Sequence, residues 1–234
     1  MARAARRRAL TAADGSDIVT LAVPSDPELL VAWRDGDSIA GQELFARYYG
    51  MVSRFFANKV CGDPADLIQA TFEACLRSHE QIRDGGQFRS FLFGIAYNVL
   101  RGHYRSKRAH DDRFDPTTRS SADLSPGAGS MLACGEEQQL LLAALRRLPL
   151  EHQIALELFY WEDLTIPELA AVLEIPEGTV KSRLHRGRAL LEQAMDRIGA
   201  PDDARESVRV QLGQWAARMQ AAAHDDGGSP GAST

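Results

Sequence analysis

Apolar residues recur every three or four positions through two long blocks of the chain, the spacing of helices that bury one face. The first block runs from Asp26 to about Arg108, and short polar breaks divide it into four predicted helices. The second block runs from Glu136 to about Ile198. The pattern therefore predicts an all-α protein with two small helical domains.

The same spacing predicts which faces of the third and fourth helices are buried. The third helix is expected to begin at Asp63-Pro64, because aspartate caps a helix and proline suits its first turn. The fourth is expected from Phe88 to about Arg108, after a loop at 82–87. The residues expected to be buried are Ile68, Phe72, Cys75, Leu76 and His79 in the third helix and Phe91, Leu92, Ile95, Ala96 and Val99 in the fourth.

The segment from Leu164 to Arg188 has the pattern of two short helices joined by a tight turn. Thr165 and Glu168 form a capping box at the start of the first helix. The second helix has an apolar face (Val180, Leu184, Gly187, Leu191), an opposite face with Ser182, His185 and Arg186, and flanks with Lys181, Arg183 and Arg188. This layout is typical of a helix-turn-helix, in which one face packs on the protein and the other enters the DNA major groove. The alternative is a solvated, charge-rich helix in an ordinary bundle.

Composition separates the two helical blocks from their surroundings. Between them the chain turns to Asp, Ser, Thr, Pro and Gly, which bury too little apolar surface to fold alone. We expect a disordered N-terminal tail (1–25), an N-terminal helical bundle (26–108), a flexible acidic linker (109–135), a C-terminal helix-turn-helix domain (136–198) and a C-terminal extension (199–234). The extension is expected to hold a short amphipathic helix, with Val208, Leu212, Trp215 and Met219 on one face, and a disordered end.

A second candidate nucleic-acid face lies on the predicted helix 88–108. Tyr97, Arg101, Tyr104 and Arg108 share one side of it, opposite the apolar stripe. Alternating aromatic rings and arginines suit a single strand, because bases stack on the rings while guanidiniums hold phosphates. The loop 82–87 beside this face could accept an extruded base. The alternative is that the tyrosines only cover the domain surface and the arginines lay their stems on it.

The charge distribution favours binding at chosen places over general adhesion to nucleic acid. The formal net charge is −5, yet basic residues cluster between Arg101 and Arg108 and between Lys181 and Arg188. Salt screens charges beyond about 8–10 Å, so such clusters set the field that a nearby phosphate meets. No apolar run approaches the roughly 20 residues that span a bilayer. We therefore expect a cytoplasmic protein without membrane insertion.

The sequence offers no motif for covalent chemistry. Cys61, Cys75 and Cys134 are odd in number and far apart, which predicts neither a disulfide framework nor a zinc site. Small buried side chains are the favoured interpretation, with a redox-sensing thiol as the alternative. The histidines are scattered, and no phosphate-binding glycine loop or nucleophile motif is present. We expect no enzyme activity and no cofactor.

Two motifs, in this order, resemble the extracytoplasmic-function group of bacterial RNA polymerase sigma factors. The first is Asp66–Phe72 followed by Phe88–Asn98, and the second is Gly178–Arg188. The resemblance covers about residues 26–198. It implies a subunit that binds core RNA polymerase, recognises −35 and −10 promoter elements and promotes DNA melting.

The resemblance also implies roles for individual residues. Lys181, Ser182, His185 and Arg186 would read the −35 element in the major groove, with Arg183 and Arg188 on phosphates. The −10 element would be held by the loop residues Arg83 and Gln87 and by Tyr97, Asn98, Arg101, Tyr104, Arg105 and Arg108. Asp66, Leu67, Gln69 and Phe72 would dock on the clamp helices of the largest polymerase subunit. The other implied partners are the polymerase flap, promoter DNA in duplex and single-stranded form, and an anti-sigma factor or another regulator.

Two residues depart from the family pattern. Glu174 stands at the helix-turn-helix turn, where the family often has glycine, and a left-handed backbone there would cost about 1 kcal/mol. His185 stands where arginine or an aromatic residue is frequent, which points to an unusual promoter sequence. The rival interpretations are a free-standing helix-turn-helix regulator that binds a palindrome as a dimer and a helical scaffold that binds only protein. The role of the Trp215 segment is left open between packing, inhibition and a polymerase contact.

Overall fold

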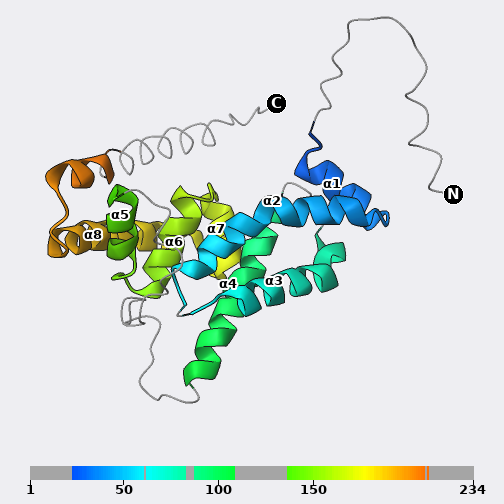
Figure 1. Cartoon of the computed structure of the whole chain (residues 1–234), viewed down its shortest axis with the longest axis horizontal. Helices are drawn as coiled ribbons and strands as arrows, with labels where there is room; N and C mark the ends of the chain where they lie inside the picture. The colour runs from blue at the N-terminus through cyan, green and yellow to red at the C-terminus, as the bar shows by residue number, and fades with distance from the viewer. Residues whose placement is uncertain (1–22, 61, 83–86, 109–135, 209, 211–234) are drawn as a thin grey trace, which may run out of the picture.

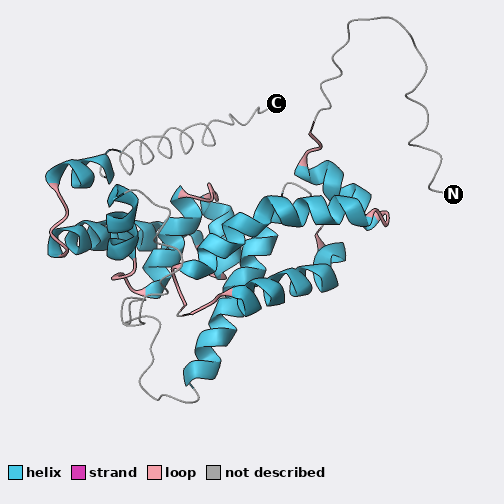
Figure 2. Ribbon diagram, in the orientation of Figure 1, coloured by secondary structure: helices cyan, strands magenta, loops and turns pink. Residues whose placement is uncertain are grey.

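The computed structural model (Figure 1) describes residues 23–60, 62–82, 87–108, 136–208 and 210. Every regular element among these residues is helical (Figure 2), as the sequence predicts. The N-terminal domain holds α1 (Asp26–Arg34), α2 (Ser38–Ala57), α3 (Ala65–Ser78), the short 3-10 helix η2 (His79–Gln81) and α4 (Phe88–Arg108). The C-terminal domain holds α5 (Glu136–Leu145), α6 (Leu150–Tyr160), α7 (Ile166–Leu173) and α8 (Glu177–Arg197). A further helical segment covers 202–208.

Local sequence sets where the first helices begin. Glu28 accepts a hydrogen bond from the backbone N–H of Ser25 at 2.7 Å, which closes a capping box on α1. The side chain of Asp37 accepts from the amide two residues on at 3.0 Å and caps α2. Asp63 does the same at 2.9 Å just before α3. Asp63 thus bonds to the first helical amide as predicted, but Pro64 occupies the N-cap position and α3 begins at Ala65, one residue later than expected.

Trp33 of α1 packs against both α2 and the end of α3. Its ring lies edge-on to Phe45 of α2, with centroids 5.3 Å apart, and stacks on His79 at 4.1 Å. A Cβ at Gly41 would lie 2.7 Å from the indole nitrogen of Trp33, so α1 and α2 approach this closely only with glycine there. These contacts fix α1 against α2 and the end of α3.

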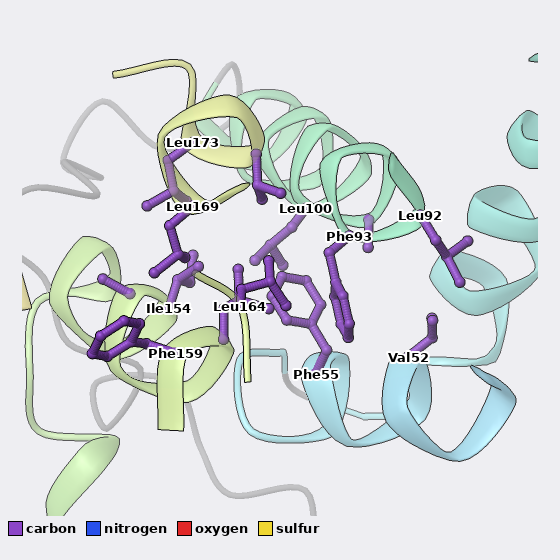
Figure 3. Close-up of a cluster of buried hydrophobic side chains, with 14 of the residues drawn as sticks. Val52, Phe55, Leu92, Phe93, Leu100, Ile154, Phe159, Leu164, Leu169 and Leu173 are labelled. Carbon is purple, nitrogen blue, oxygen red and sulfur yellow. The ribbon is translucent and has the colours of Figure 1, made fainter. Parts of the chain in front are cut away.

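The buried side chains of the two domains form one continuous core. Helix α4 packs on α3 in its own domain and on α7 of the other domain. Figure 3 shows Phe55, Phe93 and Leu100 of the N-terminal domain clustered with Leu164 and Leu169 of the C-terminal domain. The sequence predicts two tethered domains, and this contact between them is the main feature that it does not predict.

Three structural expectations differ from the structure. Leu76 is 49% exposed, whereas Thr71 is buried, because α3 turns Ile68, Thr71 and Cys75 inward at helical spacing. On α4, Phe93 and Leu100 are fully buried although they lie outside the predicted stripe, since this helix packs on two sides. The first helix of the C-terminal domain ends at Leu145 instead of Leu148, and hydrogen-bonded turns fill the gap before Pro149.

Several predicted segments lie outside the described residues. They are the N-terminal tail to residue 22, the linker 109–135, and most of the extension, including Leu212, Trp215 and Met219. Of that amphipathic face only Val208 is described, and it packs on the core. Among the described helices, none is long and apolar enough to cross a membrane.

Candidate nucleic-acid interface

Helices α7 and α8 and the turn between them form the predicted helix-turn-helix. The Glu168 carboxylate accepts hydrogen bonds from the backbone N–H and the hydroxyl of Thr165, both at 2.8 Å, so the predicted capping box is present. At the other end of α7, the backbone N–H of Ile175 donates to the carbonyl of Ala170 at 3.1 Å. Glu174 caps this end with φ 55° and ψ 43°, a left-handed conformation that an L-residue adopts at a cost.

Replacing Glu174 with glycine is expected to raise the free energy of unfolding by about 1 kcal/mol, because glycine adopts the left-handed region without a Cβ clash. Urea unfolding followed by circular dichroism measures the change. The matched control is Glu177→Gly, at the first residue of α8, where glycine brings only its entropic cost and should lower stability. A loss of stability in Glu174→Gly would contradict the proposed backbone strain.

Helix α8 presents one face to α6 and the opposite face to solvent. Val180, Leu184, Gly187 and Leu191 are buried, which confirms the predicted apolar stripe. A Cβ at Gly187 would lie 3.2 Å from the side chain of Leu156, so the absence of a side chain lets α8 lie close to α6. Lys181, Ser182, His185 and Arg186 are exposed together. A rigidly seated helix thus displays two cations, an imidazole and a hydroxyl on one surface.

The two flanking arginines of α8 contact α6. Arg183 is 16% exposed and pairs with Glu151 at 2.7 Å, while its carbonyl oxygen lies 3.0 Å from Nδ1 of His152. Arg188 is half-buried beside Tyr160, where burial raises the pKa of the phenol and the guanidinium opposes that rise. Both arginines therefore lie beside the exposed face of α8, and their contacts with α6 help to fix the orientation of α8.

The predicted single-strand face on α4 is only partly open to solvent. Asn98, Arg101 and Arg105 are exposed, and the Arg101 guanidinium lies 5.6 Å from the centre of the half-buried Tyr97 ring. Tyr104 is 4% exposed, and its hydroxyl donates a hydrogen bond to the backbone carbonyl of Lys59. The expectation that Tyr104 lies on the exposed side is therefore wrong.

Tyr104 is buried because the inward face of α4 is wider than the apolar stripe read from the sequence. The helix contacts α2 and α3 as well as α7, so positions outside a single stripe also lie in the core. The backbone of Arg108 belongs to α4, but its side chain is outside the described residues.

The loop before α4 is described only at its two ends. Ile82 is 3% exposed and anchors the start, whereas Gln87 is exposed and its carbonyl accepts from the Ser90 hydroxyl at 3.0 Å. Arg83 is outside the described residues. The predicted capture of a base by this loop stays a prediction.

Helix α3 carries the residues predicted to contact polymerase. Asp66 and Gln69 are exposed, and Leu67 and Phe72 are half-buried. The Phe72 ring packs against Tyr49, which is 57% exposed, with centroids 6.2 Å apart. Leu76 follows Phe72 by one helical turn and is also exposed, so the surface holds more apolar area than predicted. The four-residue spacing from Phe72 to Leu76 places both on one side of α3, and the sequence alone does not distinguish a buried face from an exposed apolar surface.

Cys75, on α3, does not expose its thiol at this surface. Cys75 is buried, and burial raises the pKa of its thiol to about 12, so it stays protonated and unreactive at neutral pH. Cys61 and Cys134 lie outside the described residues. No group of three or more His, Cys, Asp or Glu residues that could hold a metal ion occurs in the described part of the chain.

Two family models match the chain in the order that the motifs suggest. Sigma-70 region 2 matches residues 44–110, which include α3 and α4, and sigma-70 region 4 matches residues 138–191, which include the helix-turn-helix. The RNA polymerase sigma factor CarQ of Myxococcus xanthus is 32% identical over 171 residues, which cover 71% of this chain and 95% of CarQ. The ECF RNA polymerase sigma-E factor of Escherichia coli K12 is 24% identical over 177 residues, 72% of this chain and 93% of that protein.

Two solved structures share the fold. The sigma factor RpoE in complex with the anti-sigma factor NepR from Bartonella quintana is 19% identical, with a TM-score of 0.56 over 66% of this chain and 96% of that chain. CnrH in complex with the cytosolic domain of CnrY is 23% identical, with a TM-score of 0.54 over 74% and 97%. The matched regions and the relatives show that this chain belongs to the extracytoplasmic-function group of bacterial RNA polymerase sigma factors.

Proposed function

We propose that this sigma factor reads a −35 element with α8 and opens the −10 element with α4 and the loop before it. The coarser function follows from the family: a sigma factor binds core RNA polymerase and promoter DNA, recognises promoters, and is not an enzyme. The observation that carries the finer proposal is the exposed face of α8, whose opposite side is seated on α6.

The −35 contacts are proposed for Lys181, Ser182, His185 and Arg186 on base edges and Arg183 and Arg188 on phosphates. Arginine can donate two hydrogen bonds to one guanine in the major groove, which makes Arg186 the strongest candidate for sequence recognition. The Ser182 hydroxyl already donates to the Gly178 carbonyl at 2.9 Å, so it would contact a base as an acceptor.

The −10 contacts are proposed for two groups of residues. Asn98, Arg101 and Arg105 are exposed on α4, where they would hold the backbone of the melted strand and the adjacent duplex. Arg83, Gln87 and Arg108 extend this set, with Arg83 and Gln87 at the base-capturing loop. Tyr97 is half-buried beside Arg101 and would stack on a base, whereas the buried Tyr104 is left out of this set.

The polymerase contact is proposed for Asp66, Leu67, Gln69 and Phe72, with Tyr49 and Leu76 added to it. Large apolar side chains exposed side by side on a folded domain favour a protein partner. Helix α3 presents a carboxylate at its start and apolar groups towards its end, which suits a partner surface with basic and apolar parts. The clamp helices of the largest polymerase subunit are the expected partner.

Reversing the charge at Asp66 tests this assignment. Asp66→Lys should weaken the binding of core polymerase about tenfold, the loss expected when one complementary charge becomes repulsive. Fluorescence anisotropy of the labelled protein titrated with core polymerase measures the affinity, and Asp35→Lys, an exposed position between α1 and α2, is the control. Equal affinities for the wild type and Asp66→Lys would place the polymerase contact elsewhere.

We also propose that an anti-sigma factor or another regulator controls this protein in the cytoplasm, where polymerase acts. Support comes from the solved relatives, RpoE with the anti-sigma factor NepR and CnrH with the cytosolic domain of CnrY.

A further inference from the structure

Helix α6 holds α8 at Arg183, on the flank of the exposed face. The Arg183 guanidinium pairs with the Glu151 carboxylate at 2.7 Å, and the two side chains are only 16% and 28% exposed. A charge-assisted hydrogen bond of this length, partly shielded from solvent, restricts both side chains to one arrangement. Arg183 is therefore fixed in position, whereas Lys181 and Arg186 are exposed to solvent on the same helix.

The backbone of Arg183 is held as well. The His152 side chain is 10% exposed, and its Nδ1 atom lies 3.0 Å from the Arg183 carbonyl oxygen. A carbonyl oxygen only accepts, so Nδ1 of His152 carries the hydrogen and donates it. This carbonyl lies inside α8, where the regular helix pattern already supplies it with the amide of Gly187. The imidazole therefore adds a bond from outside without interrupting the helix.

Close packing at Gly187 completes the junction. A Cβ at Gly187 would lie 3.2 Å from the Leu156 side chain and 3.5 Å from Cβ of His152. Gly187 follows Arg183 by about one helical turn, so α6 meets α8 along that whole turn. Oε1 of Glu151 also lies 3.7 Å from Nε2 of His152. We call Glu151, His152, Arg183 and Gly187 the α6–α8 junction.

The α6–α8 junction fixes the rotation of α8 about its own axis. Side chains of a helix reach about 6 Å from its axis, so a rotation of about 30° would move their ends by about 3 Å. Hydrogen bonds to base edges need donor–acceptor distances within a window of about 0.5 Å, whereas attraction to phosphates extends over several ångströms. The rotation of α8 therefore affects base contacts far more than phosphate contacts.

Glu151 also offsets the charge of Arg183. A guanidinium has five N–H donors and a carboxylate engages at most two of them, so Arg183 keeps donors for a phosphate. Its net attraction to DNA is smaller, because the Glu151 charge lies 2.7 Å away. Attraction to phosphates is the same for every sequence, so a smaller charge on this flank leaves more of the affinity to base contacts.

We propose that Glu151 and His152, on a helix with no proposed DNA contact, are positioning residues for −35 recognition. Acting through Arg183, His152 sets the rotation of α8, and Glu151 orients the guanidinium and limits its attraction to phosphates. This inference rests on the proposed role of α8. It gives the acid beside the DNA surface a function, which is to lower the affinity for DNA of any sequence and raise the discrimination among sequences.

Replacing Glu151 with glutamine tests the effect of the charge, because glutamine keeps the size of the side chain. The probes are two labelled duplexes: a promoter fragment selected for transcription by this holoenzyme, and the same fragment with its −35 element scrambled. Fluorescence anisotropy during titration with the holoenzyme, at several salt concentrations, gives the affinities. In Glu151→Gln the ratio of the two affinities should fall about fivefold, part of the discrimination of one base contact. The slope of log affinity against log salt should steepen by about 1, as expected for one more free cation.

Asp196→Asn is the matched control. Asp196 pairs with Arg205 at 2.6 Å towards the far end of α8, so this variant removes the same charge and also breaks an ion pair of the helix. It should leave both the ratio and the slope unchanged. If the wild type discriminates and Glu151→Gln matches it in ratio and slope, the positioning role of Glu151 is wrong. A wild type that binds both duplexes equally would instead overturn the −35 assignment on which the inference rests.

Two replacements of His152 test the rotation separately. The amide nitrogen of asparagine stands as many bonds from the backbone as Nδ1 does, so His152→Asn can still donate to the Arg183 carbonyl. His152→Leu fills similar space without a donor, and it should lower the affinity ratio about fivefold at an unchanged salt slope. His152→Asn should keep most of the ratio, and circular dichroism checks that both variants are folded. A ratio unchanged in His152→Leu, or lost equally in both variants, would exclude this role for the imidazole.

Discussion

Replacing Arg186 with alanine is expected to weaken binding of the holoenzyme, core polymerase with this sigma factor, to its promoter about 5- to 150-fold. The loss corresponds to about 1–3 kcal/mol for one bidentate contact to a base. Arg186 is exposed on the outer face of α8, whose inner face is fixed on α6. Binding to promoter fragments that differ at single −35 positions measures the effect. At the contacted position the variant should no longer distinguish the four bases.

Arg197→Ala is the matched control. Arg197 is an exposed arginine in the last turn of the same helix, so removing it changes the net charge equally. Arg197 lies eleven positions after Arg186, about 16 Å along the helix, which places it away from the proposed contact. If Arg186→Ala lowered affinity by the same factor on every −35 sequence, Arg186 would be a phosphate contact and the proposed base recognition would be wrong.

Reversing the charge of Arg105 is expected to slow promoter opening about tenfold or more. Arg105 is exposed on α4, where the proposed path of the melted strand runs, and a glutamate there would repel phosphates that arginine attracts. Permanganate reactivity of thymines in the −10 region measures the opening rate. Binding of core polymerase by the variant should stay unchanged, since the proposed polymerase surface is on α3.

Two controls isolate the opening step. Arg34→Glu makes the same charge change at an exposed position at the end of α1. A template with a mismatched, already open −10 region bypasses melting, so Arg105→Glu should regain most of its activity on it. An equal defect on the open and the paired template would mean that Arg105 contributes to duplex binding and not to melting.

The helices and the helix-turn-helix were predictable because local rules decide them. The Thr165–Glu168 capping box and the apolar stripe of α8 follow from spacing alone, and both are confirmed. The sequence also marked Glu174 as a position where the turn would need a left-handed backbone, and its backbone is left-handed. The all-α class and the family follow from the same short-range patterns.

The contact between the domains was not predictable, because it joins residues far apart in the sequence through both apolar and charged groups. Lys59 and Glu157 are 98 residues apart, and each alone resembles an ordinary surface charge. The same contact explains why Phe93 and Leu100 are buried although the predicted apolar stripe of α4 does not include them. Leu76 illustrates a different limit: an apolar residue on a helix can serve an exposed binding surface instead of the core.

The central claim is that this chain gives core polymerase promoter specificity through two separate DNA surfaces. Its most direct test is transcription by purified core polymerase and this protein from a pool of templates with randomised upstream sequence, each identified by a barcode within its transcript. We predict that the transcribed templates share two sequence elements about 25 base pairs, or roughly two and a half turns of duplex, apart. Core polymerase alone should select neither. Transcripts with no shared upstream sequence, or with a single palindrome, would contradict the account.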